Sequence, residues 1–181
     1  MQDSFTQPYL NDAVHQFRTL KALAERAMAQ ITDADLFTAL DEEANSIGVL
    51  LKHMAGSMHA RWANFPSSAE EPPERHRDSE FAIDERDTQQ ALIERWEAGW
   101  QCLFDALARL TPEDIASTVR IRGKSLSVIE AINRQLTHYA YHVGQIVFLA
   151  KHFRSGAWQS LSIPRGKSEE FTRAVRQRYE A

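Results

Sequence analysis

The sequence predicts an all-α fold: a four-helix bundle followed by a short C-terminal helix, within a chain of 181 residues. Four long segments repeat apolar residues every three or four positions, which is the spacing of one helix face. Residues that cap or break helices stand between these segments. No internal repeat and no change in composition divides the chain, so we expect residues 1–181 to form one domain.

The first two long helices are expected over residues 10–31 and 47–65. Between them, residues 32–45 are polar and predict a connection with one or two helical turns. Ser46 has the side chain of a good N-cap for the second helix. Pro66 should end that helix, because proline lacks the backbone N–H and clashes with the preceding turn.

The third long helix is expected to begin at Thr88 and to end near Leu110. Its apolar face includes Trp96 and Trp100, whose helical spacing indicates packing in the core. The segment that precedes it, residues 66–81, is rich in proline and charge. We expect this segment to be a surface connection and the most mobile part of the chain.

The fourth long helix is expected to start at Ser125 or Ser127 and to run to Phe153. Before it, Thr111 is followed by proline and two acidic residues, a pattern typical of a helix start. Residues 117–123 alternate briefly between polar and apolar side chains, which predicts a short extended stretch.

The C-terminal tail predicts a loop around Pro164 and Gly166 and then one short helix packed on the bundle. The segment IPRGKS within it has a glycine and basic residues ahead of a helix, as some anion sites do. It lacks the full phosphate-loop pattern and no strand precedes it, so nucleotide binding is not expected. Ser168 is the better candidate for a helix cap.

Composition excludes several classes of protein. With 43% hydrophobic and 25% charged residues and a net charge of -4, the chain has globular composition and no basic cluster for nucleic acid. No run approaches the ~18 apolar residues of a membrane helix, and the N-terminus has no signal-peptide pattern. Cys102 is the only cysteine, which excludes an internal disulfide and a cysteine-based zinc site. A cytoplasmic protein is therefore expected.

Two histidines of the fourth helix, His138 and His142, lie four residues apart. On a helix they share one strip with Gln135 and Gln145, at the edge of the apolar face. Residues four apart are neighbours on a helix surface, so both imidazoles can reach one ion. The alternative is that each ring is a core histidine that hydrogen-bonds to a neighbour.

A third histidine, His53, lies on the second helix beside Gly56 and Ala60, small residues that would let another helix approach closely. Together with the pair on the fourth helix it would give three neutral nitrogen ligands. Such a set leaves a coordination position open, as catalytic metal sites do. The remaining histidines lack a partner at suitable spacing and are expected on the surface: His15, His59, His76 and His152.

Four segments, LLKHMAG, RHRDSEF, EAINRQLTHYAYHVGQIVFLAK and SLSIPRGKS, together resemble the DinB/YfiT-like superfamily, and within it the DUF1572 group. The resemblance spans residues 10–168. It implies a four-helix bundle, often dimeric, that holds one divalent metal ion (zinc, nickel or iron) on three histidines. These carry over to His53, His138 and His142. The resemblance also implies that the relatives of this chain include thiol-dependent S-transferases and metal-dependent amide hydrolases and isomerases.

Metal chemistry favours a transferase that takes a small-molecule substrate and a low-molecular-weight thiol. An open divalent site can activate water or a thiol. Hydrolysis would usually require a carboxylate base nearby, and none falls on the histidine strip. Gln135 and Gln145 are candidates for the shell around the ligands. A hydrolase and a non-catalytic, metal-stabilised interaction or stress protein remain alternatives. A di-iron carboxylate bundle is excluded, because the sequence has no Glu-x-x-His.

Two further expectations concern surfaces. RHRDSEF (residues 75–81) could hold an anionic substrate or close over the pocket, or it could be an ion-paired loop anchored by Phe81. We expect that a single four-helix core does not cover every aromatic side chain, which favours a homodimer formed by helix faces. The alternative is that residues 158–179 cover this surface. The aromatic residues concerned are Tyr9, Phe17, Trp96, Trp100 and Phe104.

Overall fold

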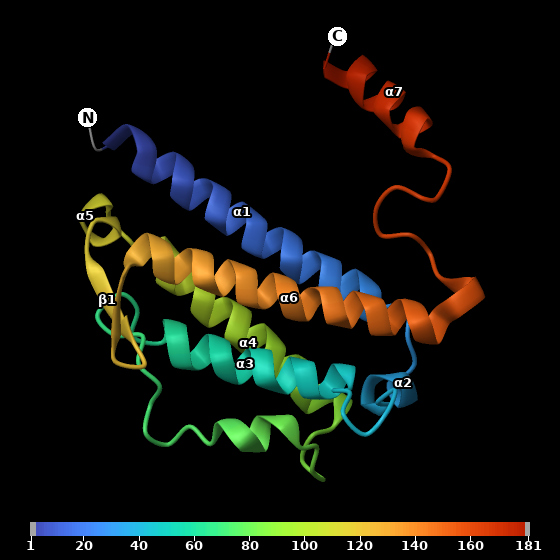
Figure 1. Ribbon diagram of the computed structural model, residues 1–181, viewed down its shortest axis with the longest axis horizontal. Helices are drawn as coiled ribbons and strands as arrows, with labels where there is room; N and C mark the ends of the chain where they lie inside the picture. Colours follow the sequence, from blue (N-terminus) through green and yellow to red (C-terminus); the bar gives the residue numbers. More distant parts are fainter. Residues whose placement is uncertain (1–2, 180–181) are drawn as a thin grey trace.

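The computed structural model describes residues 3–179 and has the expected all-α fold (Figure 1). Four long helices form the bundle: α1 (Asp3–Met28), α3 (Ile47–Trp62), α4 (Gln89–Ala108) and α6 (Val128–Arg154). α1 packs along α6, α3 packs along α4, and α3 also faces α6. This last contact places the second and fourth predicted helices side by side.

The predicted N-caps of three long helices are confirmed. The side-chain oxygens of Ser46, Thr88 and Ser127 each accept a hydrogen bond from the backbone N–H three residues later. Such bonds satisfy amides that have no partner within the helix. Of the two candidates for the start of α6, Ser127 is correct: it is the last residue of strand β2 (Lys124–Ser127) and caps the helix directly, whereas Ser125 lies earlier in the strand.

The predicted bounds of α1 were wrong at both ends. The helix starts at Asp3 instead of residue 10, continues through Pro8 and ends at Met28. The hydroxyl of Tyr9 donates hydrogen bonds to the carbonyl oxygen of Ile129 (3.2 Å) and to Asn133. These tertiary contacts hold the first turns against α6, which local propensity alone does not predict. α3 also ends at Trp62, three residues before the predicted end.

The connections contain short elements. α2 (Asp33–Phe37) and α5 (Pro112–Ile115) are the short turns that the sequence predicted, each with a capping box. The predicted extended stretch is β1 (Thr118–Ile121), which pairs antiparallel with β2, a strand that was not predicted. Arg122 and Gly123 form the turn of this hairpin with positive φ.

Aromatic side chains fill the middle of the bundle. Trp96 and Trp100 are completely buried, so the expectation that they leave an uncovered aromatic surface was wrong. Phe17 lies edge-on to Trp62 and Trp100, and the indole of Trp62 donates a hydrogen bond to the hydroxyl of Tyr139 at 3.1 Å. Because the four helices cover these rings themselves, neither a partner nor the C-terminal tail is needed to bury them.

The C-terminal tail departs from the prediction in another way. Trp158 and Leu161, next to the short helix η2 (Ser155–Ala157), pack against the core, but α7 (Ser168–Tyr179) has no buried residue. Figure 1 shows α7 apart from the bundle. The short C-terminal helix is confirmed, whereas its packing on the bundle was wrong. Among residues 3–179, no helix is both long enough and apolar enough to cross a membrane.

Candidate metal centre

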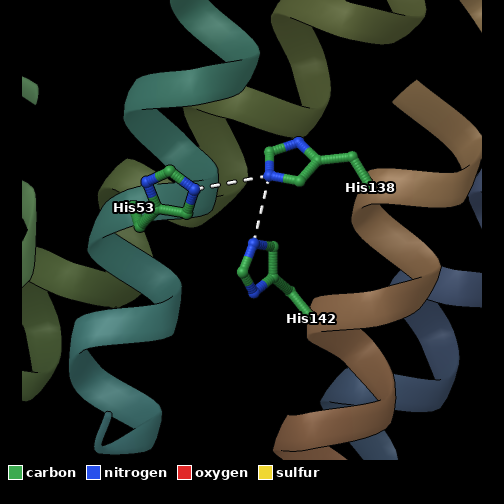
Figure 2. Close-up of side chains that lie close together, drawn as sticks. All are labelled: His53, His138 and His142. Atoms are coloured by element: carbon green, nitrogen blue, oxygen red, sulfur yellow. Dashed lines mark hydrogen bonds between the residues drawn. The ribbon is translucent and has the colours of Figure 1, made fainter. Parts of the chain in front are cut away.

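The structure brings together three histidines from two helices. His53 on α3 faces His138 and His142, which lie one turn apart on α6 (Figure 2). The Nε2 atom of His138 is 3.4 Å from Nε2 of His53 and 3.0 Å from Nε2 of His142. The three rings therefore direct the same nitrogen toward one point.

In His53 and His142, the second ring nitrogen, Nδ1, forms a hydrogen bond with a neighbouring side chain. Nδ1 of His53 lies 2.9 Å from Oε2 of Glu80, and Nδ1 of His142 lies 2.8 Å from Oε1 of Gln145. Both oxygens are acceptors, so each Nδ1 is the N–H donor of its hydrogen bond. In the neutral form of each ring, the Nε2 atom then carries the lone pair that faces the common point. Metal-binding histidines in proteins are held in the same way.

The spacing of the nitrogens fits a small divalent ion. Ligand distances of about 2.0–2.1 Å around tetrahedral zinc place neighbouring nitrogens about 3.3 Å apart. The two observed separations, 3.4 and 3.0 Å, are close to this value. The three ligand atoms also all lie within 4.8 Å of one another. His53, His138 and His142 could hold one such ion.

The surroundings keep the histidines of α6 neutral. Burial, followed by repulsion from His142 and His53, lowers the pKa of His138 to about 3. Burial also lowers the pKa of His142, although the hydrogen bond from its ring to Gln145 opposes this shift. A neutral imidazole is the form that binds a metal ion. Near neutral pH both rings therefore have that form without losing a proton.

Glu80 is the residue of the centre that the sequence analysis missed. It lies in the short helix η1 (Arg77–Phe81), within the RHRDSEF motif, and is buried against α3. Arg75 donates hydrogen bonds to both of its carboxylate oxygens, at 2.8 and 2.9 Å. Burial by itself favours the protonated acid, but hydrogen bonds from His53 and Arg75 lower the pKa of Glu80 below its usual range. A buried carboxylate thus orients His53.

The segment 66–81 is a connection at the surface, as expected, but side chains of α3 and η1 anchor it to the bundle; that it is the most mobile part of the chain stays a prediction. The Arg61 guanidinium reaches from α3 to the carbonyl oxygen of Ala69 (2.7 Å) and to Glu71 (2.6 Å). Ala69 and Glu80 are both buried. The ion pair of Arg75 with Glu80 confirms that RHRDSEF is an ion-paired loop, and half-buried Phe81 lies beside the ring of His53. Binding of an anionic substrate by the motif stays a prediction.

Gly56 makes the approach of Glu80 possible. A Cβ atom at this position would lie 2.8 Å from Cδ of Glu80 and still closer to its Oε1. The small residue beside His53 therefore admits a carboxylate from η1. The sequence predicted the approach of another helix there, and the short helix η1 takes that place.

Gly56→Ala is expected to displace this carboxylate and to weaken zinc binding by about 10- to 100-fold, the usual effect of losing a partner of a metal ligand. Competition with a chromogenic chelator measures the affinity. Gly144→Ala is the matched control, because no atom outside its own helix and neighbours lies within 4 Å of the added carbon. Equal zinc affinity in both variants would show that Glu80 does not orient His53.

A cavity of about 220 Å³ adjoins the histidines. His53 and His138 form part of its wall together with Ser57 and Gln135, so the cavity borders two of the three histidines. The rest of the wall is basic and comes from α3, the 66–81 segment, the hairpin turn and α6: Arg61, Arg75, Arg77, Arg122 and Arg134.

The two glutamines of the histidine strip differ in position. Gln145 binds the ring of His142, as a residue of the surrounding shell would. Gln135 contacts no ligand nitrogen; it is buried at the cavity, and its Oε1 atom has no hydrogen-bond partner within the described chain. The remaining histidines are exposed, as expected: His15, His59, His76 and His152.

The fold and the site define an all-α bundle with a three-histidine cluster between two of its helices. The model of the family DUF1572, described as a protein of unknown function, matches residues 4–167. The chain belongs to this family. The all-helical fold is also consistent with the resemblance to the DinB/YfiT-like superfamily. A comparison with curated proteins found no match.

Proposed function

We propose that the protein binds one divalent metal ion (zinc, nickel or iron) through His53, His138 and His142, and that it transfers a group to or from a low-molecular-weight thiol. The convergence of three Nε2 atoms beside a cavity carries this proposal. A divalent ion held there would favour the thiolate form of a thiol, which is the nucleophilic form. The chain itself supplies neutral ligands, their orientation and a partly enclosed space for the reactants.

Thiol chemistry is favoured over hydrolysis because, among the described residues, no carboxylate at the histidines is free to act as a base. Glu80 is the nearest acid, and both of its oxygens accept hydrogen bonds from His53 or Arg75. Its lowered pKa also makes it a weak base. None of the described side chains in the cavity wall is a carboxylate. A hydrolase would have to draw its base from the substrate or from solvent.

The cavity beside the histidines favours a catalytic metal site over a purely structural one. Structural zinc sites are closed by four protein ligands. Within the described chain, the cluster contains three histidines, and the cavity reaches two of them from one side. A small molecule could therefore approach the ligand nitrogens without any change in the bundle.

Cobalt substitution tests the proposal directly. Protein reconstituted with Co²⁺ should bind one ion per chain, and its visible spectrum reports the coordination number. Addition of 2-mercaptoethanol should produce a sulfur-to-cobalt charge-transfer band, whereas the matched alcohol, ethylene glycol, should produce none. A spectrum that no thiol alters would contradict the thiol-transferase proposal.

A cytoplasmic location belongs to the same proposal. The cytoplasm supplies low-molecular-weight thiols and keeps cysteines reduced. Cys102, the single cysteine, is half-buried on α4, and burial raises the pKa of its thiol. The Cys102 thiol is thus poorly reactive and is not expected to act as a nucleophile.

We also propose that the chain forms a two-fold dimer through helix faces near the metal centre. The exposed aromatic side chains are not those named by the sequence analysis. Tyr141 and Phe148 on α6 are 64% and 63% exposed, and the ring of Tyr141 lies 5.1 Å from that of His142. Exposed apolar patches of this kind often mark interfaces.

Light scattering at micromolar concentration should therefore give twice the mass of one chain. The double variant Tyr141→Ser/Phe148→Ser should shift the mass toward the monomer. Phe171→Ser on α7, a residue of similar exposure (51%), should not. A monomeric mass for the unmodified protein over a wide concentration range would refute pairing.

A further inference from the structure

The wall of the cavity carries more positive than negative charge. Arg61, Arg75 and Arg122 all donate hydrogen bonds to Oε1 of Glu71, and Arg75 also pairs with Glu80. Two carboxylates thus offset only part of the charge of five arginines, which leaves an excess of three positive charges. A concave wall of one sign concentrates ions of the opposite sign.

Two of these arginines have no acidic partner. The side chain of Arg134 on α6 forms no hydrogen bond or ion pair with any other described residue, and neither does the Arg77 guanidinium, which lies over the face of the Phe81 ring at 4.9 Å. Both side chains are exposed to solvent as well as to the cavity. Guanidinium groups match carboxylate and phosphate oxygens with two parallel hydrogen bonds.

The buried amide of Gln135 points to the same space independently. This residue is only 4% exposed, it lines the cavity, and its Oε1 atom has no donor within the described chain. A buried acceptor without a partner costs free energy unless an occupant of the cavity supplies a donor. A carboxylate or phosphate oxygen only accepts, so this donor would come from another polar group of the occupant or from a water molecule bound with it.

We propose that the cavity binds a small molecule bearing a carboxylate or phosphate group, with Arg77 and Arg134 contacting its oxyanion beside His53 and His138. This inference rests on the proposed function, for which it names the substrate class. The volume of about 220 Å³ lies below the ~300–1,000 Å³ of sites for drug-sized ligands, so it fits a small organic acid or phosphate ester.

Calorimetric titration of the full-length, metal-free protein with succinate and with inorganic phosphate tests the site without metal chemistry. One binding site per chain is expected for at least one of the two anions. Arg134→Gln and Arg77→Gln should each weaken binding by about 10- to 100-fold, the effect of losing a charged hydrogen bond. Arg120→Gln, an exposed arginine of β1 outside the cavity wall, is the matched control and should change it less than twofold.

Binding of neither anion, or equal weakening by Arg120→Gln, would overturn the proposal. Because Arg77 and Arg134 are exposed, circular dichroism should show the same fold in every variant.

A second titration separates this proposal from the proposed function. Mercaptosuccinate and succinate have the same two carboxylates and differ by one thiol. On zinc-loaded protein mercaptosuccinate should bind at least tenfold more tightly than succinate, and on metal-free protein the two should bind alike. If both bind equally in either form, the thiol function fails while the oxyanion site stands. If zinc binds but succinate and phosphate do not, the oxyanion site alone fails.

Discussion

Substitution of His138 by alanine is expected to abolish binding of one metal ion per chain and to leave the helical content largely intact. Nε2 of His138 lies between the other two, at 3.4 and 3.0 Å, so its removal leaves two nitrogens. The loss of affinity should exceed the ~10–100-fold typical of a partner behind a ligand. The fold should survive because the buried aromatic and aliphatic side chains of four long helices stabilise it.

Metal analysis and far-ultraviolet circular dichroism of the same samples measure both quantities. His152→Ala, an exposed histidine further along the same helix, is the control and should bind metal as the unmodified protein does. A His138→Ala variant that retains one tightly bound ion would contradict the assigned ligands. Loss of the helical signal on metal removal would instead show that the site holds the fold together.

The cluster of three histidines could be predicted from the sequence in part because two of them, His138 and His142, lie on one helix. His138 and His142 share a helix that has clear apolar spacing and a good N-cap, so their common direction follows from helix geometry. The position of His53 opposite them depends on how two helices pack. The family resemblance supplied that step, since spacing along one chain cannot.

Glu80 and the cavity could not be predicted in the same way. Segment 66–81 has no long periodic pattern, so nothing local indicates that it returns to α3. Its path depends on buried ion pairs, such as those of Arg61 with Glu71 and of Arg75 with Glu80, between residues that composition marks as solvent-exposed. Gly56 beside His53 was the one local sign that something approaches closely.

The fold shows the same division between local and tertiary causes. The caps of α3, α4 and α6 depend on a few adjacent residues and were predicted correctly. The first turns of α1 depend on the contacts of Tyr9 with α6. The sequence predicts the helix α7 correctly, but it does not show that α7 buries no residue against the bundle. Burial of Trp96 and Trp100 likewise follows from the packing of all four helices rather than from the spacing on one of them.

Glu80 should have two separable effects, one on stability and one on the metal. Its side chain is 10% exposed and that of its partner Arg75 is 7% exposed, so Glu80→Ala leaves a buried guanidinium without its main counter-ion. Breaking a buried pair costs about 3–5 kcal/mol of unfolding free energy. The lower end is expected, because Glu71 still accepts a hydrogen bond from Arg75 at 3.1 Å. The same change releases Nδ1 of His53 and should weaken zinc binding by about 10- to 100-fold.

Glu80→Gln separates the two effects. The amide oxygen can still accept the hydrogen bond from Nδ1 of His53, so zinc affinity should fall less than in Glu80→Ala. The amide N–H₂ would then face the donors of Arg75, a contact between two donors that should lower stability almost as much as alanine does. Urea unfolding and zinc competition measure the two quantities. Glu97→Gln, which breaks an exposed ion pair with Lys21, is the control and should cost no more than about 1 kcal/mol. If the glutamine and alanine variants lose zinc affinity equally while stability stays unchanged, Glu80 acts on the centre through its charge and not by orienting His53.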